Sequence, residues 1–176
     1  VDHAVSTEWD VVVIGGGPAG SMAARAAARS GARTLVIDRS HFPRYKVCGG
    51  GLIGASLAAL PRDVVVPSRD AADSVTFTYG FDGAATRRAN SPFMALINRA
   101  EFDEHLLASA AASGAAVATG VRLREVAQEG DEVVLTTSVG EIRTRAVVGA
   151  DGSSGVTSHF VGAAFEQVDL GLEVEL

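Results

Sequence analysis

The chain contains one cysteine, no long apolar run and few features of an exported protein. Cys48 is the only cysteine among 176 residues, which excludes an intrachain disulfide framework and a cysteine-rich metal site. No apolar run approaches the roughly 18 residues that a membrane-spanning helix needs, and the first ten residues lack the apolar core of a secretory signal peptide. We therefore expect a cytoplasmic protein.

An excess of positive charge is also absent. The 15 Lys and Arg residues are outnumbered by 21 Asp and Glu, which gives a formal net charge of −6 at pH 7, so no nucleic-acid partner is expected. Lys46 is the one lysine among these cations. With 47% hydrophobic residues, the composition is otherwise that of a globular domain with a core of its own.

The N-terminal part of the chain has the pattern of a strand–helix–strand unit. The apolar run 9–14 is typical of a strand buried on both faces. The Ala-rich segment 19–30 favours a helix, which Gly31 ends. Residues 34–37 predict a second buried strand, closed by Asp38. Together these segments form a βαβ unit.

The loop inside this unit, Gly15-x-Gly17-x-x-Gly20, matches the dinucleotide-binding pattern G-x-G-x-x-G. The first glycine permits a tight turn, the second lets the backbone approach a pyrophosphate, and the third lets helix and strand pack closely. Asp38 is placed to accept hydrogen bonds from ribose hydroxyls, and its charge disfavours a 2′-phosphate. The loop predicts a dinucleotide site, and the alternative is a glycine-rich turn without a ligand.

The remainder of the chain mixes strands with short helices and predicts an α/β fold. A short helix is expected over 52–60, a strand over 74–79 with an antiparallel return over 85–89 after the turn signal 81–83, a further strand over 93–97, and a helix over 100–113. A strand over 116–119 and a β-meander over 121–128, 133–138 and 142–148 follow. We expect helices on one face of a parallel sheet and the meander on the other. The last residues, 173–176, have the pattern of an incomplete strand. No linker separates domains, so residues 1–176 are taken as one incomplete domain.

Three motifs resemble those of the FAD-binding flavoproteins related to p-hydroxybenzoate hydroxylase. The loop G-G-G-P-A-G-S over 15–21 resembles that family's FAD-binding loop. Asn98-Arg99-x-x-Phe102-Asp103-x-x-Leu106 resembles its arginine motif at the start of a helix. Gly149-Ala150-Asp151-Gly152 resembles its GADG motif near the flavin ribityl chain and pyrophosphate. The resemblance implies FAD as the cofactor and a Rossmann-like domain with an inserted β-meander.

The stretch 43–52, P-R-Y-K-V-C-G-G-G-L, closely resembles a signature of the geranylgeranyl reductase family. This resemblance implies hydrogenation of isoprenoid C=C bonds with FAD and an electron donor such as NADPH or ferredoxin. The substrate would be a small molecule or a lipid-like isoprenoid, which leaves open a peripheral contact with a membrane. Family members are usually more than twice as long, so the chain resembles the N-terminal part of a flavoprotein. The second flavin motif and the substrate sheet would lie beyond Leu176, with 68–98 and 165–176 as candidate parts of that sheet.

The resemblance also implies roles for individual residues. Cys48 would lie near the isoalloxazine, as proton donor or pocket wall, and the alternative is a small buried apolar residue. Lys46 would bind an anion near the flavin or a substrate phosphate, or else be a solvated surface charge. Arg99 is a cation at a helix N-terminus, which is unfavourable without an anion nearby. It would contact a phosphate, or pair with Glu101 or Asp103.

Asp151 either caps the helix that follows it or approaches the flavin chain, and both roles are compatible. The four histidines show no metal-ligand spacing, so no metal is expected. Cys48 is the candidate catalytic residue. The predicted cofactor-binding residues are Gly15, Gly17, Pro18, Ala19, Gly20, Asp38, Arg39, Lys46, Cys48, Gly49, Arg99, Val121, Asp151 and Gly152.

Three functional hypotheses follow from these features. The first is an FAD-dependent oxidoreductase that reduces isoprenoid C=C bonds. The second is a flavin-dependent monooxygenase or halogenase acting on an aromatic or polyketide-like substrate, although such relatives usually carry other residues at the Lys-x-Cys positions. The third is a truncated nucleotide-binding module without turnover. The sequence leaves the oligomeric state open.

Overall fold

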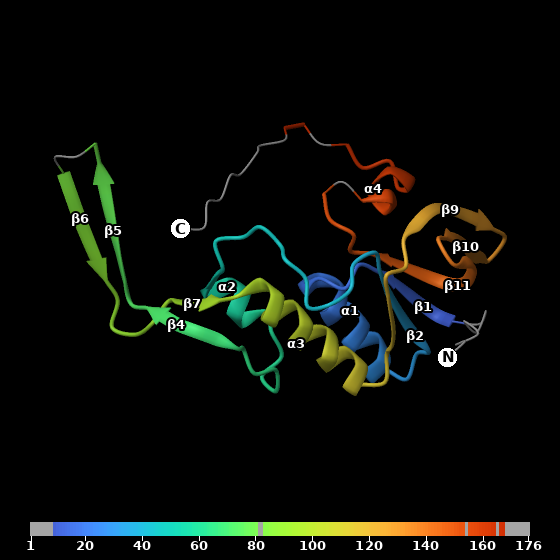
Figure 1. Cartoon of the computed structure of the whole chain (residues 1–176), viewed down its shortest axis with the longest axis horizontal. Coiled ribbons are helices and arrows are strands. Elements are labelled where there is room, and N and C mark those ends of the chain that lie inside the picture. Colours follow the sequence, from blue (N-terminus) through green and yellow to red (C-terminus); the bar gives the residue numbers. More distant parts are fainter. Residues whose placement is uncertain (1–8, 81–82, 154, 165, 168–176) are drawn as a thin grey trace. The chain divides into compact units, whose positions relative to one another are not determined.

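The computed structural model describes residues 9–80, 83–153, 155–164 and 166–167 (Figure 1). The chain divides into two compact units. Unit 1 comprises residues 1–44 and 103–172, and unit 2 comprises residues 45–102 with 173–176. Unit 2 is thus an insertion in the sequence of unit 1. No linker marks its boundaries in the sequence, so the division into two units was not predicted. The strand predicted at 173–176 lies outside the described residues.

A six-stranded sheet in the order β8-β2-β1-β11-β10-β9 forms the centre of unit 1. The strands β1 (Trp9–Ile14), β2 (Thr34–Asp38) and β8 (Ala116–Thr119) are parallel, and β1 also pairs in parallel with the long strand β11 (Gly140–Gly149). β10 (Glu132–Thr137) pairs antiparallel with the first half of β11 and with β9, Leu123–Glu129. β11 therefore belongs to both the parallel sheet and the meander.

Alternating side chains of β1 and β2 build two separate cores. Val12 and Leu35 belong to a core shared with the meander, whereas Val13 and Val36 belong to a core shared with helical residues. The helices are α1 (Pro18–Arg29) and α3 (Arg99–Ala112). The meander core comprises Val12, Ile14, Leu35, Ile37, Val121, Leu123, Val133, Leu135 and Ile142. This arrangement confirms the predicted α/β class, with helices on one face of a parallel sheet and the meander on the other.

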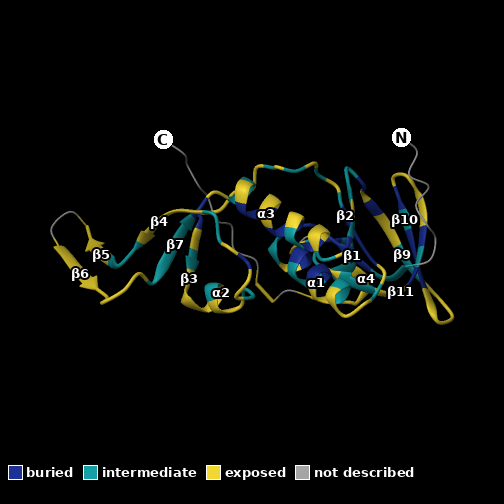
Figure 2. Ribbon diagram, turned by 90° about the horizontal axis from the view of Figure 1, so that it is seen from below, coloured by how far each residue is buried: buried dark blue, intermediate teal, exposed yellow. Residues whose placement is uncertain are grey.

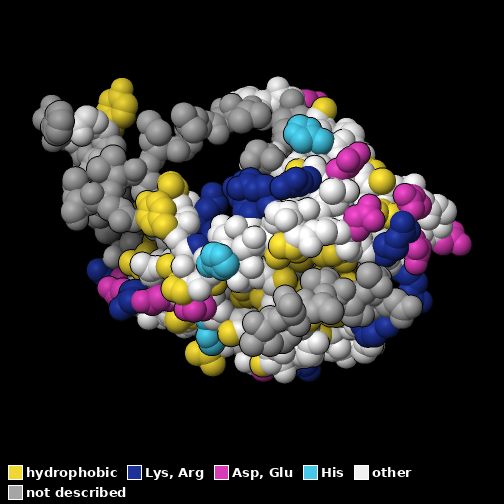
Figure 3. All heavy atoms as spheres, turned by 45° about the vertical axis from the view of Figure 1, so that its right-hand side comes forward, with side chains coloured by type: hydrophobic (Ala, Val, Ile, Leu, Met, Phe, Trp, Pro, Cys, Tyr) yellow, Lys and Arg dark blue, Asp and Glu magenta, His cyan; other side chains and the backbone are white. Residues whose placement is uncertain are grey.

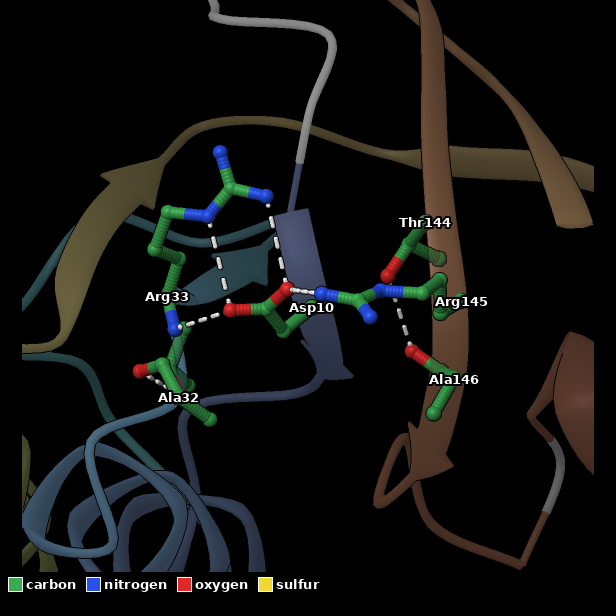
Figure 4. Close-up of polar contacts among 7 residues, drawn as sticks. Asp10, Ala32, Arg33, Thr144, Arg145 and Ala146 are labelled. Atoms are coloured by element: carbon green, nitrogen blue, oxygen red, sulfur yellow. Dashed lines mark hydrogen bonds and ion pairs between the residues drawn. The ribbon is translucent and has the colours of Figure 1, made fainter.

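Asp10 ties the starts of β1 and β2 to β11 (Figure 4). Its Oδ2 accepts the backbone N–H of Arg33 at 2.8 Å, and the guanidinium of Arg33 lies 3.4 Å from Oδ1. Arg145 of β11 forms a second ion pair with Oδ1. The Arg33 backbone bond, together with these two guanidinium groups, holds the pKa of Asp10 well below its usual range.

Unit 2 contains two small sheets. One has the order β3-β7-β4, and the other is the hairpin of β5 and β6. All of β6 and nearly all of β5 are exposed (Figure 2). Residues 81–82 of the predicted turn lie outside the described residues. The strands of unit 2 are β3 (Gly51–Ile53), β4 (Ser68–Ala72), β5 (Ser74–Tyr79), β6 (Gly83–Arg88) and β7 (Met94–Ile97).

Two expected elements need correction, and one strand was not expected. The helix expected over 52–60 is the shorter α2 (Gly54–Ala58), because Leu52 and Ile53 pair with β7 as part of β3. β4 was not predicted, since its sequence SRDAA has no apolar alternation and depends on pairing with β7. The meander begins at Leu123 and not at Val121, because the Val121 N–H donates to the carbonyl of Asp38 at 2.9 Å.

No helix among the residues that the structure describes is both long and apolar enough to cross a membrane. Charges on the surface are mixed. On the face drawn in Figure 3, basic side chains lie beside acidic ones at several places. Arg143, for example, forms ion pairs with Glu129 at 3.0 Å and with Glu132 at 3.5 Å.

Candidate functional site: the glycine loop of unit 1

Two glycines of the loop between β1 and α1 are required by the protein itself. Gly15 has a φ of +103°, in the left-handed region that L side chains rarely adopt. A Cβ at Gly15 would overlap the carbonyl oxygen of Ala150. A Cβ at Gly20 would overlap the carbonyl oxygen of Gly15 and lie 3.2 Å from the Cβ of Ala150. These glycines therefore let α1 pack against the ends of β1 and β11.

Gly17 has a different role, because its backbone is extended and its Cβ position is nearly open. Its φ and ψ are −69° and −176°, which any residue can adopt. Apart from the neighbouring residues of the chain, a Cβ there would meet only Nη2 of Arg44 among the described atoms within 4 Å, at 3.4 Å. Gly17 is also the N-cap of α1, which has no side-chain cap and no acidic residue in its first turn. The positive end of the helix is therefore suited to an external anion.

Asp38, at the end of β2, holds the loops on either side of it. Its Oδ2 accepts the backbone N–H of Gly16 at 2.7 Å, and its Oδ1 accepts that of Ser40 at 2.7 Å. A carboxylate has about four acceptor positions, so ribose hydroxyls can still bind. Val121 lies beside Asp38 through its backbone bond, and its side chain is in the meander core. The neighbouring Arg39 is exposed.

Asp151 of the GADG motif connects the end of β11 to α4 (Val156–Phe160). Its Oδ2 accepts the backbone N–H of Thr157 at 3.2 Å, and its Oδ1 accepts the Thr157 hydroxyl. Ala150 N–H donates to the carbonyl of Ile14 at 2.8 Å, which fixes the motif beside β1. Asp151 thus performs the capping role that was one of its two expected roles. A contact with the flavin chain stays a prediction.

A cavity of about 570 Å³ adjoins the same loops. Predicted cofactor residues from two motifs line it: Ala19 of α1, and Asp151 with Gly152 of the GADG segment. Apolar side chains of the meander, of α4 and of its C-cap residue complete much of the lining, including Val126, Val133, Val147, Phe160 and Val161. The fold therefore brings together motifs that are far apart in the sequence.

Pro18 is the first residue of α1, and the remaining predicted residues belong to unit 2. Three are exposed in the segment before β3: Lys46, Cys48 and Gly49. The exposure of Cys48 contradicts the alternative of a buried apolar residue. Its Sγ accepts the backbone N–H of Gly50 at 3.5 Å, and the Gly50 carbonyl accepts the N–H of Ile97 at 2.8 Å. Within unit 2, the cysteine loop is thus bonded to the end of β7, just before Arg99.

The arginine motif starts α3. Asn98 caps the helix, since its Oδ1 accepts the backbone N–H of Ala100 at 2.9 Å. Arg99 is half-buried at the first helical position. Glu101 forms an ion pair with Arg69. A phosphate contact by Arg99 stays a prediction.

Arg44, in unit 1, was not among the residues predicted from the sequence. Its Nη2 lies 3.1 Å from Oδ2 of Asp103, whose side chain is fully buried. The guanidinium carbon lies 5.0 Å from the ring centroid of Phe42. Two signals could have indicated it: Arg44 is part of the same signature as Cys48, and Asp103 is part of the arginine motif.

Comparisons with known proteins show the family to which the chain belongs. Residues 8–173 match a family described as "FAD binding domain", and the chain belongs to this family. A "Geranylgeranyl diphosphate reductase" of Rhodobacter capsulatus is 32% identical over 154 residues, covering 84% of this chain and 38% of that protein. An uncharacterized protein of Methanosarcina barkeri is 34% identical over 151 residues, covering 86% of this chain and 39% of that protein. The chain spans about two fifths of the length of these relatives.

Two solved structures share the fold. A "geranylgeranyl bacteriochlorophyll reductase-like" protein from Thermoplasma acidophilum has a TM-score of 0.66 and 29% identity, covering 82% of this chain and 39% of that one. The myxobacterial chondrochloren halogenase, a variant of FAD-dependent halogenases, has a TM-score of 0.66 and 26% identity, covering 84% of this chain and 38% of that one. The resemblance to the geranylgeranyl reductase type is thereby confirmed.

Proposed function

We propose that the chain binds FAD at the loop Gly15–Gly20 and is the cofactor-binding part of an FAD-dependent oxidoreductase. The observation that carries this proposal is the open Cβ position of Gly17 at the uncapped, acid-free N-terminus of α1. A negative charge there would interact favourably with the helix dipole, and a pyrophosphate has that charge.

Different residues of unit 1 would bind different parts of FAD. The N–H groups at the start of α1 would bind the pyrophosphate. The free acceptor positions of Asp38 would bind the ribose hydroxyls of the adenosine. Asp151 and Gly152 line the adjoining cavity and would lie along the flavin chain. Asp38 disfavours a 2′-phosphate, because two anions would face one another.

Replacing Gly17 by Val tests the site. The extended backbone tolerates Val, so the variant should fold, but its branched side chain would occupy the place of the pyrophosphate. We expect FAD binding, measured by quenching of flavin fluorescence, to be lost in Gly17→Val and kept in the control Gly54→Val. Gly54 is in α2, where a Cβ has nothing within 4 Å. Equal FAD affinity in both variants would show that FAD does not bind at the loop Gly15–Gly20.

We propose reduction of isoprenoid C=C bonds as the reaction of the longer flavoprotein. The signature over 43–52 and the two reductase-type relatives support it. When bound, reduced FAD supplies a hydride to one alkene carbon, with electrons from NADPH or reduced ferredoxin. A proton must reach the other carbon, and Cys48 is the candidate donor because its thiol is exposed within the signature.

The reaction can be tested on the longer protein with a geranylgeranyl substrate and a chemical reductant, without oxygen. The expected product has gained two hydrogens per reduced bond, as measured by mass spectrometry. Cys48→Ser should slow this step and leave the FAD affinity nearly intact. An unchanged rate in Cys48→Ser would limit Cys48 to lining the pocket.

Halogenation or hydroxylation of an aromatic or polyketide-like substrate is the second candidate. The structural similarity to the chondrochloren halogenase favours it. The two functions differ in their need for oxygen. Productive turnover only in the presence of O₂, without saturation of an alkene, would support the second function against the first.

A further inference from the structure

We propose that Arg44 binds the pyrophosphate of the dinucleotide and that Asp103 is the positioning residue that holds it there. This inference rests on the proposed FAD site and adds to it a charged side chain for which the glycine loop has no equivalent. It concerns unit 1 alone, to which both residues and the loop belong.

The position of Arg44 is the first observation. Apart from Gly17 and its two chain neighbours, its Nη2 is the only described atom within 4 Å of the place where a Cβ of Gly17 would be, at 3.4 Å. That place is where the backbone of Gly17 lies open to a ligand. The Arg44 guanidinium, a positively charged hydrogen-bond donor, therefore lies on the same side of Gly17 as the expected phosphate. The N-terminus of α1, with no acid in its first turn, supplies further N–H groups beside it.

The burial of Asp103 is the second observation. Its side chain has no solvent exposure, whereas 17% of the Arg44 side chain remains exposed. A buried carboxylate is costly unless a cation pairs with it, and Arg44 supplies such a cation, with its Nη2 3.1 Å from Oδ2 of Asp103. The pair holds the guanidinium on its buried side, and the exposed part of the Arg44 side chain remains available to an anion.

The chemistry of the guanidinium makes this double use possible. Arginine carries five N–H donors in a planar fork, and the ion pair with Asp103 is made through Nη2. Phe42, whose ring centroid is 5.0 Å from the guanidinium carbon, restricts the orientation of the fork. Since the orientation is set before the ligand binds, little side-chain entropy is lost on binding. Lysine would supply the charge without the fork.

The test compares ligands with and without phosphate. Binding of FAD, ADP and adenosine would be measured for the whole chain, its Arg44→Met variant and the control Arg124→Met, an exposed residue of β9. ADP and adenosine would be measured by competition with FAD fluorescence. We expect Arg44→Met to weaken FAD and ADP by about tenfold to a hundredfold, the range of a charged hydrogen bond. Adenosine should be unaffected, and Arg44→Lys should lie between.

Asp103→Asn tests the positioning role separately. It keeps the shape of the side chain and removes its charge, so the affinity for ADP should fall while that for adenosine is kept. Thermal melting without ligand measures any loss of stability. If Arg44→Met lowers the melting temperature but leaves the affinities for FAD and ADP unchanged, Arg44 is structural and the inference is wrong. If the unsubstituted chain binds neither FAD nor ADP, the proposed function itself fails.

Discussion

The strands of unit 1 and those of unit 2 differ sharply in burial. In unit 1, Val12, Val13 and Val36 have no solvent exposure. In unit 2, Phe77 is 61% exposed and Tyr79 is 94% exposed. The central strands of unit 1 are covered on both faces, whereas the hairpin of β5 and β6 is a separate two-stranded sheet, a form that is marginally stable alone. Burial therefore stabilises unit 1 far more than the hairpin.

This contrast can be tested with matched substitutions, since the single tryptophan reports on one unit. Trp9 lies in β1 and packs against the meander core. Its fluorescence during denaturation by urea therefore follows the unfolding of unit 1. Substitutions in unit 1 should shift this transition, and equivalent ones in unit 2 should leave it nearly unchanged.

The largest effect is expected from Gly20→Ala. The added Cβ would overlap the carbonyl oxygen of Gly15, so α1 must move away from β1. We expect a loss of about 4 kcal/mol or more in the free energy of unfolding. The control Gly54→Ala, in the open space around α2, should leave the Trp9 transition in place. A stable Gly20→Ala variant would show that α1 and β1 can separate at little cost.

A smaller effect is expected from the pair Ile37→Ala and Ile53→Ala. Ile37 is fully buried in β2, whereas Ile53 is 54% exposed in β3. Truncating the buried isoleucine should cost about 2–5 kcal/mol, and truncating the exposed one less than about 1 kcal/mol. Both are measured from the midpoint of urea denaturation. Equal costs would contradict the difference in burial between the two units.

The smallest effect concerns pH. Because the folded-state pKa of Asp10 is depressed by Arg33 and Arg145, its contribution to stability is fully present above the unfolded pKa of about 4. It is lost as the pH falls toward the folded pKa. Asp10→Asn should therefore be less stable than the unsubstituted chain at pH 7, and the difference should shrink below about pH 4. Thermal midpoints between pH 7 and pH 3 measure it, and a constant difference would exclude titration of Asp10.

Local patterns in the sequence were sufficient to predict the βαβ unit and its glycine loop. The run 9–14 can be buried on both faces only inside a sheet, and Gly15 and Gly20 are in the chain where the turn and the close packing require them. The β-meander and α3 were also predicted to within a few residues, since hydrophobic periodicity reflects burial directly. These motifs and the match over 8–173 together assign the chain to the family of FAD binding domains.

Contacts between distant segments were decided by the tertiary structure alone. β4 forms because β7 supplies its backbone partners, and nothing in SRDAA indicates a strand. Asp38 was predicted for a ribose, yet its carboxylate also binds Gly16 and Ser40. Arg44 acquires a partner only when folding buries Asp103 beside it. The hydrophobic pattern of a segment indicates which of its residues are buried. The partner of a polar side chain, in contrast, depends on which distant segments folding brings within about 3 Å of it.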